Sequence, residues 1–426
     1  MKISLIIPTR SRALYLRETL QTVAVAVQAY KGDVEVVVSD NASDDETAEV
    51  CAQSGISGLV YVRQPIRLSM RQNFEAGLNA STGSHVVFIG DDDALAPNGF
   101  VLLRDMIACG DFDIFKWRIV NYIWPDRDRG RQGSVVLRTN KVSGRVRLLN
   151  PQALLSDFIT ARINGYQSGA MIYHGCISRR LIEKVRGFQD GTYFWTTCPD
   201  VYASVANLIH ADTDILAVDL PVTIGGSSPR SNGTAGIEYT QSGAIEPTSE
   251  HAKFVAELMG DPFLGRTPAT CPSVNLVTID ALQLAHRCAG RPLKLDEVAW
   301  LERVEPELRG YPAHIASDAR DQAALVLASL ADTILAFDIQ TESKLVATTP
   351  PLAPRLESSA NIAVSLAKVK ISGGTKMNGI AQAVQVIDEV CAASTPLCDL
   401  PTTIFGSVVR VGKMLWRAHS TKGSIV

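Results

Sequence analysis

The chain has 426 residues, of which 46% are hydrophobic and 20% are charged, and its formal net charge is −3. This length is more than one ordinary domain needs, and the apolar share is large enough to build a sizeable core. The nearly balanced charge gives no global electrostatic reason to expect a nucleic-acid partner, so an anionic substrate has to be held by a local group of residues.

The start of the chain does not indicate an exported protein, and the cysteines do not indicate a structural zinc site or a disulfide framework. The apolar run Ile3–Ile7 is too short for a signal peptide and is stopped by Pro8. No stretch approaches the roughly 18–20 apolar residues that span a membrane. The eight cysteines are scattered without a C-x-x-C pair, which favours reduced thiols in the core. We expect a cytoplasmic protein, with peripheral contact at the inner face of a membrane left open.

Up to about residue 118, short apolar runs alternate with segments of helical spacing. Because the runs are continuous and each is followed by a helical segment, the pattern predicts an α/β fold, a doubly wound and mainly parallel sheet flanked by helices. The expected strands are Ile3–Pro8, Val34–Ser39, Leu59–Arg63, His85–Gly90 and Phe112–Trp117. The expected helices are Leu14–Val27, Asp44–Gln53, Met70–Ala80 and Pro97–Ala108.

From about residue 119 to 235 this alternation is lost. The segment Gly225–Gly236 is rich in Gly, Ser and Pro, which predicts a loop. It is either a lid, in which Arg230 meets a bound anion, or a linker between domains. The other elements expected in this part are helices at Pro151–Thr160, Ile177–Val185 and Pro199–Ile209 and a strand at Ile215–Val218.

Beyond about residue 245 the spacing is almost wholly helical, and the Pro-rich segment Thr348–Pro354 is expected to connect two groups of helices. We therefore predict two domains, an α/β domain over 1–235 and a helical domain of unknown role over 245–426. The helices expected in the second domain are His251–Met259, Val274–Ala289, Asp321–Ala336, Asn361–Val369, Asn378–Ala392 and Phe405–Ala418.

Polar residues follow three of the predicted strands. Pro8–Arg12 follows the first strand, Asp40–Asp44 the second, and Asp91–Asp93 the fourth. Ligands of doubly wound proteins bind at the carboxyl ends of the strands, so we expect these three segments to converge on one site.

The triple aspartate is the most distinctive of these segments. The carboxylates of Asp91, Asp92 and Asp93 repel one another at short range. A divalent cation such as Mg²⁺ or Mn²⁺ relieves this repulsion and prefers oxygen ligands, which substrate phosphates also supply. The alternative is an ordinary turn that leads into the helix expected after Pro97.

The other two loops carry further candidates for ligand contacts. Asp40 either caps the following segment through an Asx turn or accepts hydrogen bonds from a nucleobase or a ribose. Arg10 and Arg12 are either surface charges or partners of a diphosphate, and we include Arg10 among the expected ligand contacts.

Three segments in this order resemble glycosyltransferase family 2, namely Ser4–Arg10, Val38–Asp44 and Phe88–Asp93. Asn73–Gly83 is similar to the helix that precedes the aspartate motif in that family. The resemblance covers about residues 1–225. It implies a GT-A fold and an inverting transfer of a sugar from a nucleotide-activated donor, with a divalent metal.

The resemblance also implies roles for individual residues. Thr9 and Asp40 would contact the base and the ribose, and Asp91 would lie near the ribose. Asp92 or Asp93 would bind a metal that bridges the diphosphate. Many members of the family have an aspartate where this chain has glycine at position 90, so which aspartate holds the metal stays open.

The family needs a general base as well, usually an acid at the start of a later helix. The matching residue is Asp200, in the segment Trp195–Tyr202, and it would take the proton from the acceptor hydroxyl. The alternative is that Pro199 and Asp200 only begin a helix and complement its dipole. His174 and His210 are possible neighbours to which we assign no role.

The expected reaction is transfer of a sugar from a UDP or dTDP sugar to a hydroxyl of a saccharide or lipid-linked acceptor, in surface polysaccharide or glycolipid assembly. A nucleotidyltransferase that makes sugar nucleotides is one alternative, but Pro8–Arg12 lacks the glycines of its usual loop. A non-catalytic nucleotide-sugar-binding protein is the other, and the presence of Asp200 argues against it. The identity of the base, sugar and acceptor, and a homo-oligomeric state, stay open.

Overall fold

The structure is a computed structural model, and it describes residues 1–126, 130, 132–136, 144–231, 250–258, 261, 263, 273–309, 379–381, 383–385 and 387. The helices expected at Asp321–Ala336, Asn361–Val369 and Phe405–Ala418 and the connector at Thr348–Pro354 lie outside these residues, as does part of the helix expected at Asn378–Ala392.

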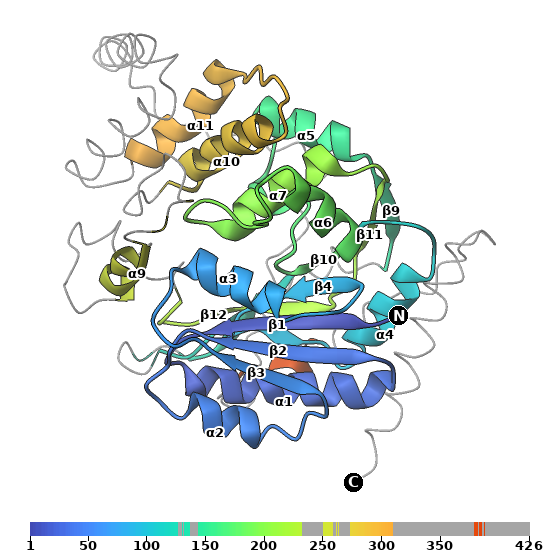
Figure 1. Cartoon of the computed structure of the whole chain (residues 1–426), viewed down its shortest axis with the longest axis vertical. Coiled ribbons are helices and arrows are strands. Elements are labelled where there is room, and N and C mark those ends of the chain that lie inside the picture. Colours follow the sequence, from blue (N-terminus) through green and yellow to red (C-terminus); the bar gives the residue numbers. More distant parts are fainter. Residues whose placement is uncertain are drawn as a thin grey trace, which may run out of the picture.

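An eight-stranded sheet forms the centre of the molecule (Figure 1). Its strands are β1 (Ile3–Thr9), β2 (Val34–Asp40), β3 (Leu59–Arg63), β4 (His85–Phe88), β6 (Ile114–Trp117), β9 (Val146–Leu149), β10 (Gly175–Ser178) and β11 (Ile215–Val218). Their spatial order is β3-β2-β1-β4-β10-β6-β11-β9. Only β10 and β9 run antiparallel to their neighbours in this sheet, which confirms the expected mainly parallel α/β fold class.

Helices cover both faces of this sheet (Figure 1). The helices of the α/β part are α1 (Ala13–Tyr30), α2 (Thr47–Ala52), α3 (Met70–Asn79), α4 (Gly99–Ile107), α5 (Pro151–Ile159), α6 (Arg179–Gly187) and α7 (Pro199–His210). Leu5 and Ile7 of β1 join the core that includes α1 and α4, whereas Ile6 joins the core that includes α3 and α7. Burial on both faces is why the strand reads as a continuous apolar run.

A second, four-stranded sheet lies next to the aspartate turn. Its strands, in spatial order, are β5 (Ala94–Leu95), β12 (Thr223–Ser227), β7 (Val120–Ile123) and β8 (Ser134–Val136). The expectation of a loop over Gly225–Gly236 is therefore wrong at its start, because residues 225–227 pair as β12 with β7. Residues 232–236 lie outside the described part. The two preceding residues of β12, Thr223 and Ile224, pair with β5, so the start of the predicted loop lies near the aspartate turn.

One expected helix begins later than its spacing indicates. Ile177 and Ser178 end β10, which lies between β4 and β6, and α6 begins at Arg179. The Ser178 hydroxyl accepts a hydrogen bond from the Leu181 N–H at 3.1 Å, as an N-cap does. Insertion between two distant strands is a long-range effect that helical spacing does not contain.

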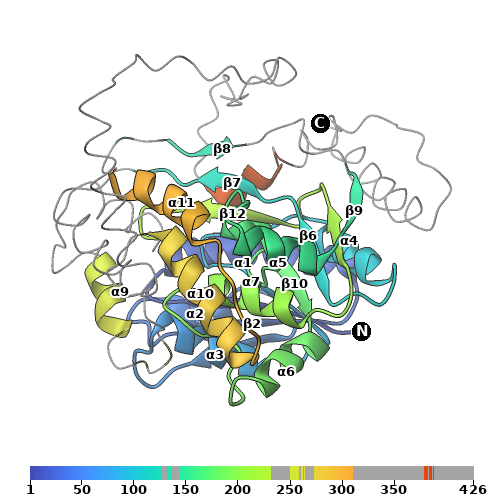
Figure 2. The ribbon, with the colours of Figure 1, turned by 90° about the horizontal axis from the view of Figure 1, so that it is seen from above.

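The described part of the C-terminal region packs on the α/β part. Its helices are α9 (Glu250–Leu258), α10 (Val274–Cys288) and α11 (Glu297–Arg309). Further along the chain, Ile380, Ala383, Val384 and Ile387 join the core that includes α1 and α4. Figures 1 and 2 show α10 and α11 beside α5 and α7, and their apolar side chains share one core. Trp300 is fully buried and donates its indole N–H to the Phe158 carbonyl at 3.0 Å. Across the described residues, no helix combines the length and the hydropathy needed to span a membrane.

Candidate active site

The three aspartates form a buried turn between β4 and β5. The exposed fractions of Asp91, Asp92 and Asp93 are 2%, 4% and 1%. The Asp93 N–H donates to the Gly90 carbonyl at 3.3 Å, which closes the turn. A buried carboxylate is costly unless it is paired or hydrogen-bonded, so the partners of these three residues define the chemistry of the site.

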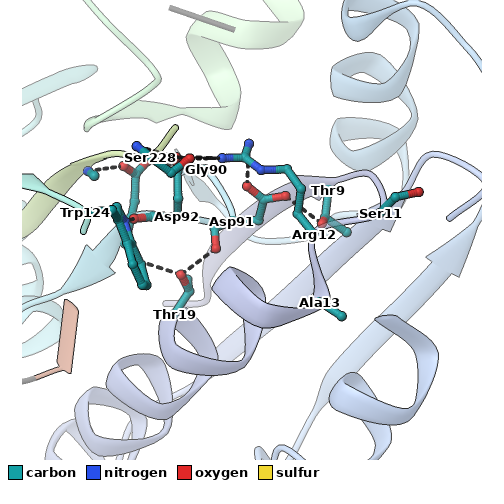
Figure 3. A network of polar contacts seen from close by, with 12 residues as sticks. Thr9, Ser11, Arg12, Ala13, Thr19, Gly90, Asp91, Asp92, Trp124 and Ser228 are labelled. Atoms are coloured by element: carbon teal, nitrogen blue, oxygen red, sulfur yellow. Dashed lines mark hydrogen bonds and ion pairs between the residues drawn. The ribbon is translucent and has the colours of Figure 1, made fainter. Parts of the chain in front are cut away.

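Arg12 lies between Asp91 and Asp92 (Figure 3). Its Nη1 is 2.8 Å from Asp91 Oδ1, and its Nη2 is 2.7 Å from Asp92 Oδ2. The Thr9 hydroxyl donates to the other oxygen of Asp91, Oδ2, at 2.7 Å. The end of β1 and the turn after β4 therefore meet, as the sequence predicts, but the cation that joins them is Arg12.

The positive charge of Arg12 at the start of α1 is stabilised by these two carboxylates. Arg12 is the N-cap residue of α1, where the helix dipole disfavours a positive charge. Its side chain is 17% exposed and its guanidinium lies 5.3 Å from the centre of the Tyr15 ring. Burial works to lower the pKa of Arg12, but the charges of Asp91 and Asp92 raise it above its ordinary value. The guanidinium is thus a permanent cation in the site.

Side chains from other elements hold the turn in place (Figure 3). The Thr19 hydroxyl contacts the carbonyl oxygens of Asp91 and Asp93, both at 2.7 Å, and the Trp124 indole N–H donates to the Asp92 carbonyl at 2.8 Å. The Ser228 hydroxyl donates to Asp92 Oδ2 at 2.6 Å. These contacts fix the backbone of the turn before any ligand binds.

Asp93 has a different set of partners. Its Oδ2 accepts from the Gly90 N–H at 2.5 Å and the Tyr173 hydroxyl at 2.6 Å, and lies 3.2 Å from His174 Nε2. Its Oδ1 accepts from the Gly226 N–H at 2.6 Å. Burial alone would raise the pKa of Asp93, but His174 and these donors hold it below its ordinary value. Asp93 is therefore an ionised carboxylate bound by the protein.

Asp91 shows the opposite behaviour. Burial, together with the neighbouring charges of Asp92 and Asp93, raises its pKa to about 6 against the opposing effect of Arg12. Its Oδ1 is buried and makes no hydrogen bond among the described residues, although it pairs with Arg12. This is the carboxylate of the turn that a bound cation would stabilise most.

Gly90 marks the departure from the family pattern, and the structure explains it. A Cβ atom at Gly90 would lie 2.6 Å from the Tyr173 hydroxyl oxygen. The space of the missing side chain is used by Tyr173, which donates to Asp93. A side chain at position 90 would therefore require the Tyr173 hydroxyl to move.

His174, to which the sequence assigns no role, links Asp93 to the second sheet. It has a φ of 55°, unusual outside glycine, and its N–H donates to the Phe88 carbonyl at 3.0 Å. Its Nδ1 lies 2.8 Å from Thr223 Oγ1, to which the Trp117 indole N–H donates at 2.7 Å. The Thr223 hydroxyl can then donate to Nδ1, which leaves Nε2–H facing Asp93. No local sequence signal marks this residue.

Asp200 lies in the first turn of α7, directly after Pro199, as predicted. Burial raises the pKa of Asp200, while hydrogen bonds from backbone N–H groups and the charge of His174 oppose the rise. Burial of Tyr166 and of Tyr173 is the main cause of their raised pKa values, and the charge of Asp200 adds to the effect. Because Tyr173 and His174 both contact Asp93, Asp200 is within electrostatic reach of the aspartate turn.

Asp40 and Arg10 stand apart from Asp91 and Asp92 in their contacts. Asp40 pairs in register with Thr9, but its carboxylate accepts from the Tyr61 hydroxyl at 2.5 Å and the Ser43 N–H at 2.9 Å. The contact with Ser43 is a local side-chain-to-backbone cap, one residue longer than the Asx turn considered above. Arg10 forms an ion pair with Glu257 of α9, so two arginines two positions apart turn to different partners.

The carboxylates differ in what they could offer to a metal. Four protein groups contact the Asp93 carboxylate. Asp91 Oδ1 and Asp92 Oδ2, in contrast, are paired with Arg12. The described part holds no ready group of three or more His, Cys, Asp or Glu side chains for a metal ion. Oxygens of Asp91 and Asp92 fit a hard cation whose remaining ligands come from a substrate.

Two solved structures are similar to this chain at low identity. Residues 1–349 of S. aureus TarS in complex with UDP-GlcNAc are 16% identical, with 76% of this chain and 88% of that chain covered and a TM-score of 0.41. The mannosyltransferase PcManGT from Pyrobaculum calidifontis, in complex with GDP-Man and Mn²⁺, is 17% identical, with coverages of 77% and 86% and a TM-score of 0.35.

Two sequence comparisons concern smaller parts of the chain. Over 107 residues, or 24% of this chain, it is 34% identical to the abequosyltransferase RfbV of Salmonella typhimurium. The match covers 32% of the length of that relative. Residues 4–182 match the sequence model of glycosyl transferase family 2. The segment that carries Thr9, Arg12 and the aspartate turn is therefore similar to glycosyltransferase family 2.

Proposed function

We propose that this protein is an inverting glycosyltransferase that moves a sugar from a nucleoside diphosphate sugar to a hydroxyl acceptor. The observation that carries the proposal is the buried group of Thr9, Arg12, Asp91 and Asp92 within a family 2 segment. The similarity to an abequosyltransferase supports sugar transfer as the reaction.

The donor would bind at the carboxyl ends of β1, β2 and β4. Thr9 and Asp40 lie side by side at the ends of β1 and β2, where they would meet the base and the ribose. Asp91 would meet the ribose, and UDP and dTDP donors both fit an acceptor oxygen on Asp40. For Asp40 to do so, its contact with the Tyr61 hydroxyl has to be shared or released.

We further propose a divalent metal, Mn²⁺ or Mg²⁺, at Asp92, with Asp91 beside it. Asp93 is the weaker candidate because four protein groups already bind it. When bound, the metal would neutralise charge on the leaving diphosphate. Arg12, which carries a positive charge at the same place, would contribute to the same stabilisation.

Asp200 is the proposed general base. The acceptor oxygen forms a bond to the anomeric carbon as the bond from that carbon to the diphosphate breaks, and Asp200 takes the proton of the hydroxyl. Burial raises the pKa of Asp200, which makes it a stronger base than an ordinary exposed aspartate. The acceptor is proposed to be a saccharide or a lipid-linked saccharide, in surface polysaccharide or glycolipid assembly.

Calorimetric titration with a panel of nucleoside diphosphates, with and without Mn²⁺, tests the donor site. Tight binding of one base, strengthened by Mn²⁺, is the expected result. Incubation of the matching sugar nucleotide with candidate acceptors should then release the nucleoside diphosphate. Release of pyrophosphate from a nucleoside triphosphate and a sugar phosphate would instead establish a nucleotidyltransferase. Donor binding without release in the presence of any acceptor class would favour a non-catalytic binding protein.

A further inference from the structure

A protein cation already lies between the two carboxylates that the proposed function gives to a metal and its donor. Arg12 Nη1 is 2.8 Å from Asp91 Oδ1, and Nη2 is 2.7 Å from Asp92 Oδ2. We propose that Arg12 is the internal counter-ion of this aspartate pair, and that the donor diphosphate draws it away. Divalent metal would then bind the pair only together with the diphosphate. This inference rests on the proposed function.

Arg12 supplies a cationic partner to each carboxylate of the pair. Asp91 and Asp92 are almost fully buried, and two adjacent buried carboxylates repel each other strongly. Arg12 forms one ion pair with each of them through different nitrogens, which a guanidinium can do and a point charge cannot do equally well. A free cation therefore competes with a tethered one that is always present at high local concentration.

Release of Arg12 would expose carboxylate oxygens that a metal could bind. Asp91 Oδ1 is buried and makes no hydrogen bond within the described part of the chain, so Arg12 is its main partner. Movement of Arg12 would leave this oxygen and Asp92 Oδ2 facing the site without their cation. Two carboxylate oxygens together with diphosphate oxygens make a suitable ligand set for Mg²⁺ or Mn²⁺.

Arg12 is held in a way that permits exchange of its partners. Its Nε–H is buried and makes no hydrogen bond among the described residues, and its place at the N-terminus of α1 is unfavourable for a cation. Its Nη2 also donates to Ser228 Oγ at 2.6 Å. A diphosphate offers the guanidinium more acceptor oxygens than two aspartates do, and arginine binds phosphate oxygens through paired hydrogen bonds.

Binding of Mn²⁺ alone to the full-length protein, followed by electron paramagnetic resonance of the free ion, tests this role. We expect weak binding to the wild type and at least a ten-fold gain in affinity for Arg12→Met. The double variant Arg12→Met with Asp92→Asn should lose that gain. Arg17→Met removes the same charge from an exposed position on the same helix and should bind Mn²⁺ like the wild type.

A second measurement uses the nucleoside diphosphate without metal. Arg12→Met should bind it at least ten-fold more weakly than the wild type, because the guanidinium that moves to the phosphates is missing. If Arg12→Met does not fold, the variants Arg12→Lys and Ser228→Ala can replace it, because each weakens the counter-ion without removing it. Each should bind Mn²⁺ more tightly than the wild type.

Equal Mn²⁺ affinity in the wild type and in every folded Arg12 or Ser228 variant would overturn the counter-ion role. If nucleotides still bind in that case, the proposed function stands and only the role of Arg12 falls. Absence of nucleotide binding in the wild type and in every variant, by contrast, would overturn the donor site and the coupling together.

Discussion

Two aspartates of one turn have opposite electrostatic roles, although they are two positions apart. Burial acts on both, but Asp91 faces a single cation and has its pKa raised to about 6, whereas Asp93 is surrounded by donors and has its pKa lowered. The residue type therefore does not assign the role. The partners that the fold brings to each carboxylate do.

For the proposed base, we expect Asp200→Asn to lower turnover by about 10² or more while donor affinity changes by a few fold at most. An amide cannot take the acceptor proton, but it has nearly the same shape. Initial rates and calorimetric titration with the same donor measure the two effects. Full turnover in this variant would remove Asp200 from the role.

The same residue makes a prediction about pH. Asp200 acts as a base only when ionised, and burial raises its pKa, so kcat/KM should fall on acidification at a pH above the ordinary range of aspartate. The acidic limb should be missing from the residual activity of Asp200→Asn. A limb that is unchanged in that variant would belong to another group.

At the scale of elements, β12 positions the aspartate turn. A Cβ atom at Gly226 would lie 1.7 Å from the Asp92 carbonyl oxygen, and the Gly226 N–H donates to Asp93. Gly226→Ala should therefore displace the turn and weaken donor binding at least ten-fold. It should also lower the free energy of unfolding by about 1–3 kcal/mol, because a buried carboxylate loses a donor.

Gly187 at the end of α6 supplies a matched control for that substitution. A Cβ atom there would meet no other atom within 4 Å. Gly187→Ala should leave donor binding unchanged and shift the urea midpoint only slightly. If both glycine variants behave alike in calorimetry and urea unfolding, β12 does not position the site.

Glu35 joins β1, β2 and the turn before β4. It forms an ion pair with Lys2 at 2.6 Å and accepts from the Gly83 N–H at 2.9 Å. Although burial works against it, these partners, with Ser4 and Thr82, lower the pKa of Glu35 from 4.5 to about 2. The stabilisation is therefore present above about pH 4.5 and is lost as the pH falls toward 2.

The corresponding prediction is that Glu35→Gln lowers the free energy of unfolding by about 1–3 kcal/mol at pH 7. The difference from the wild type should shrink as the pH falls from 4.5 toward 2, because Glu35 then takes up a proton in the unfolded wild type before it does so in the folded protein. Urea unfolding of both proteins at several pH values measures this. A difference independent of pH would mean that the charge of Glu35 is not the stabilising feature.

At the scale of the whole molecule, the C-terminal helices pack against the α/β part that contains the proposed site. Side chains of α10 and α11 share a core with α7, the helix whose first turn contains Asp200. The predicted division into domains 1–235 and 245–426 stays a prediction, but this shared core leads us to expect that 1–235 does not fold alone. Circular dichroism and size-exclusion chromatography of that fragment would show this.

A substitution at Trp300 tests, without truncating the chain, whether the C-terminal helices stabilise the α/β part. Trp300 is fully buried and hydrogen-bonded to Phe158 of α5. Trp300→Ala should lower the free energy of unfolding by about 3–5 kcal/mol, and Trp300→Phe by less because most of the apolar volume is kept. A loss below 1 kcal/mol for Trp300→Ala would show that the helical region contributes little to the stability of the core.

Local patterns in the sequence determined several of the elements and their order along the chain. Continuous apolar runs, each followed by helical spacing, predicted β1, β2, β3, α1 and α3 to within a few residues, because burial on two faces leaves a direct trace in composition. The same logic placed Thr9 near Asp91 and put Asp200 in the first turn of a helix. Strand ends and helix starts are local features, and a sequence contains them.

Only the tertiary structure decided which of these residues meet. Arg12 and Ser228 are 216 positions apart, yet they contact each other and Asp92. Likewise, β10 enters the sheet between β4 and β6 and brings His174 to Asp93. Such partners depend on strand order and on the space left by other side chains. Charge and burial act through three-dimensional distance, and the spacing of residues along a chain does not specify that distance.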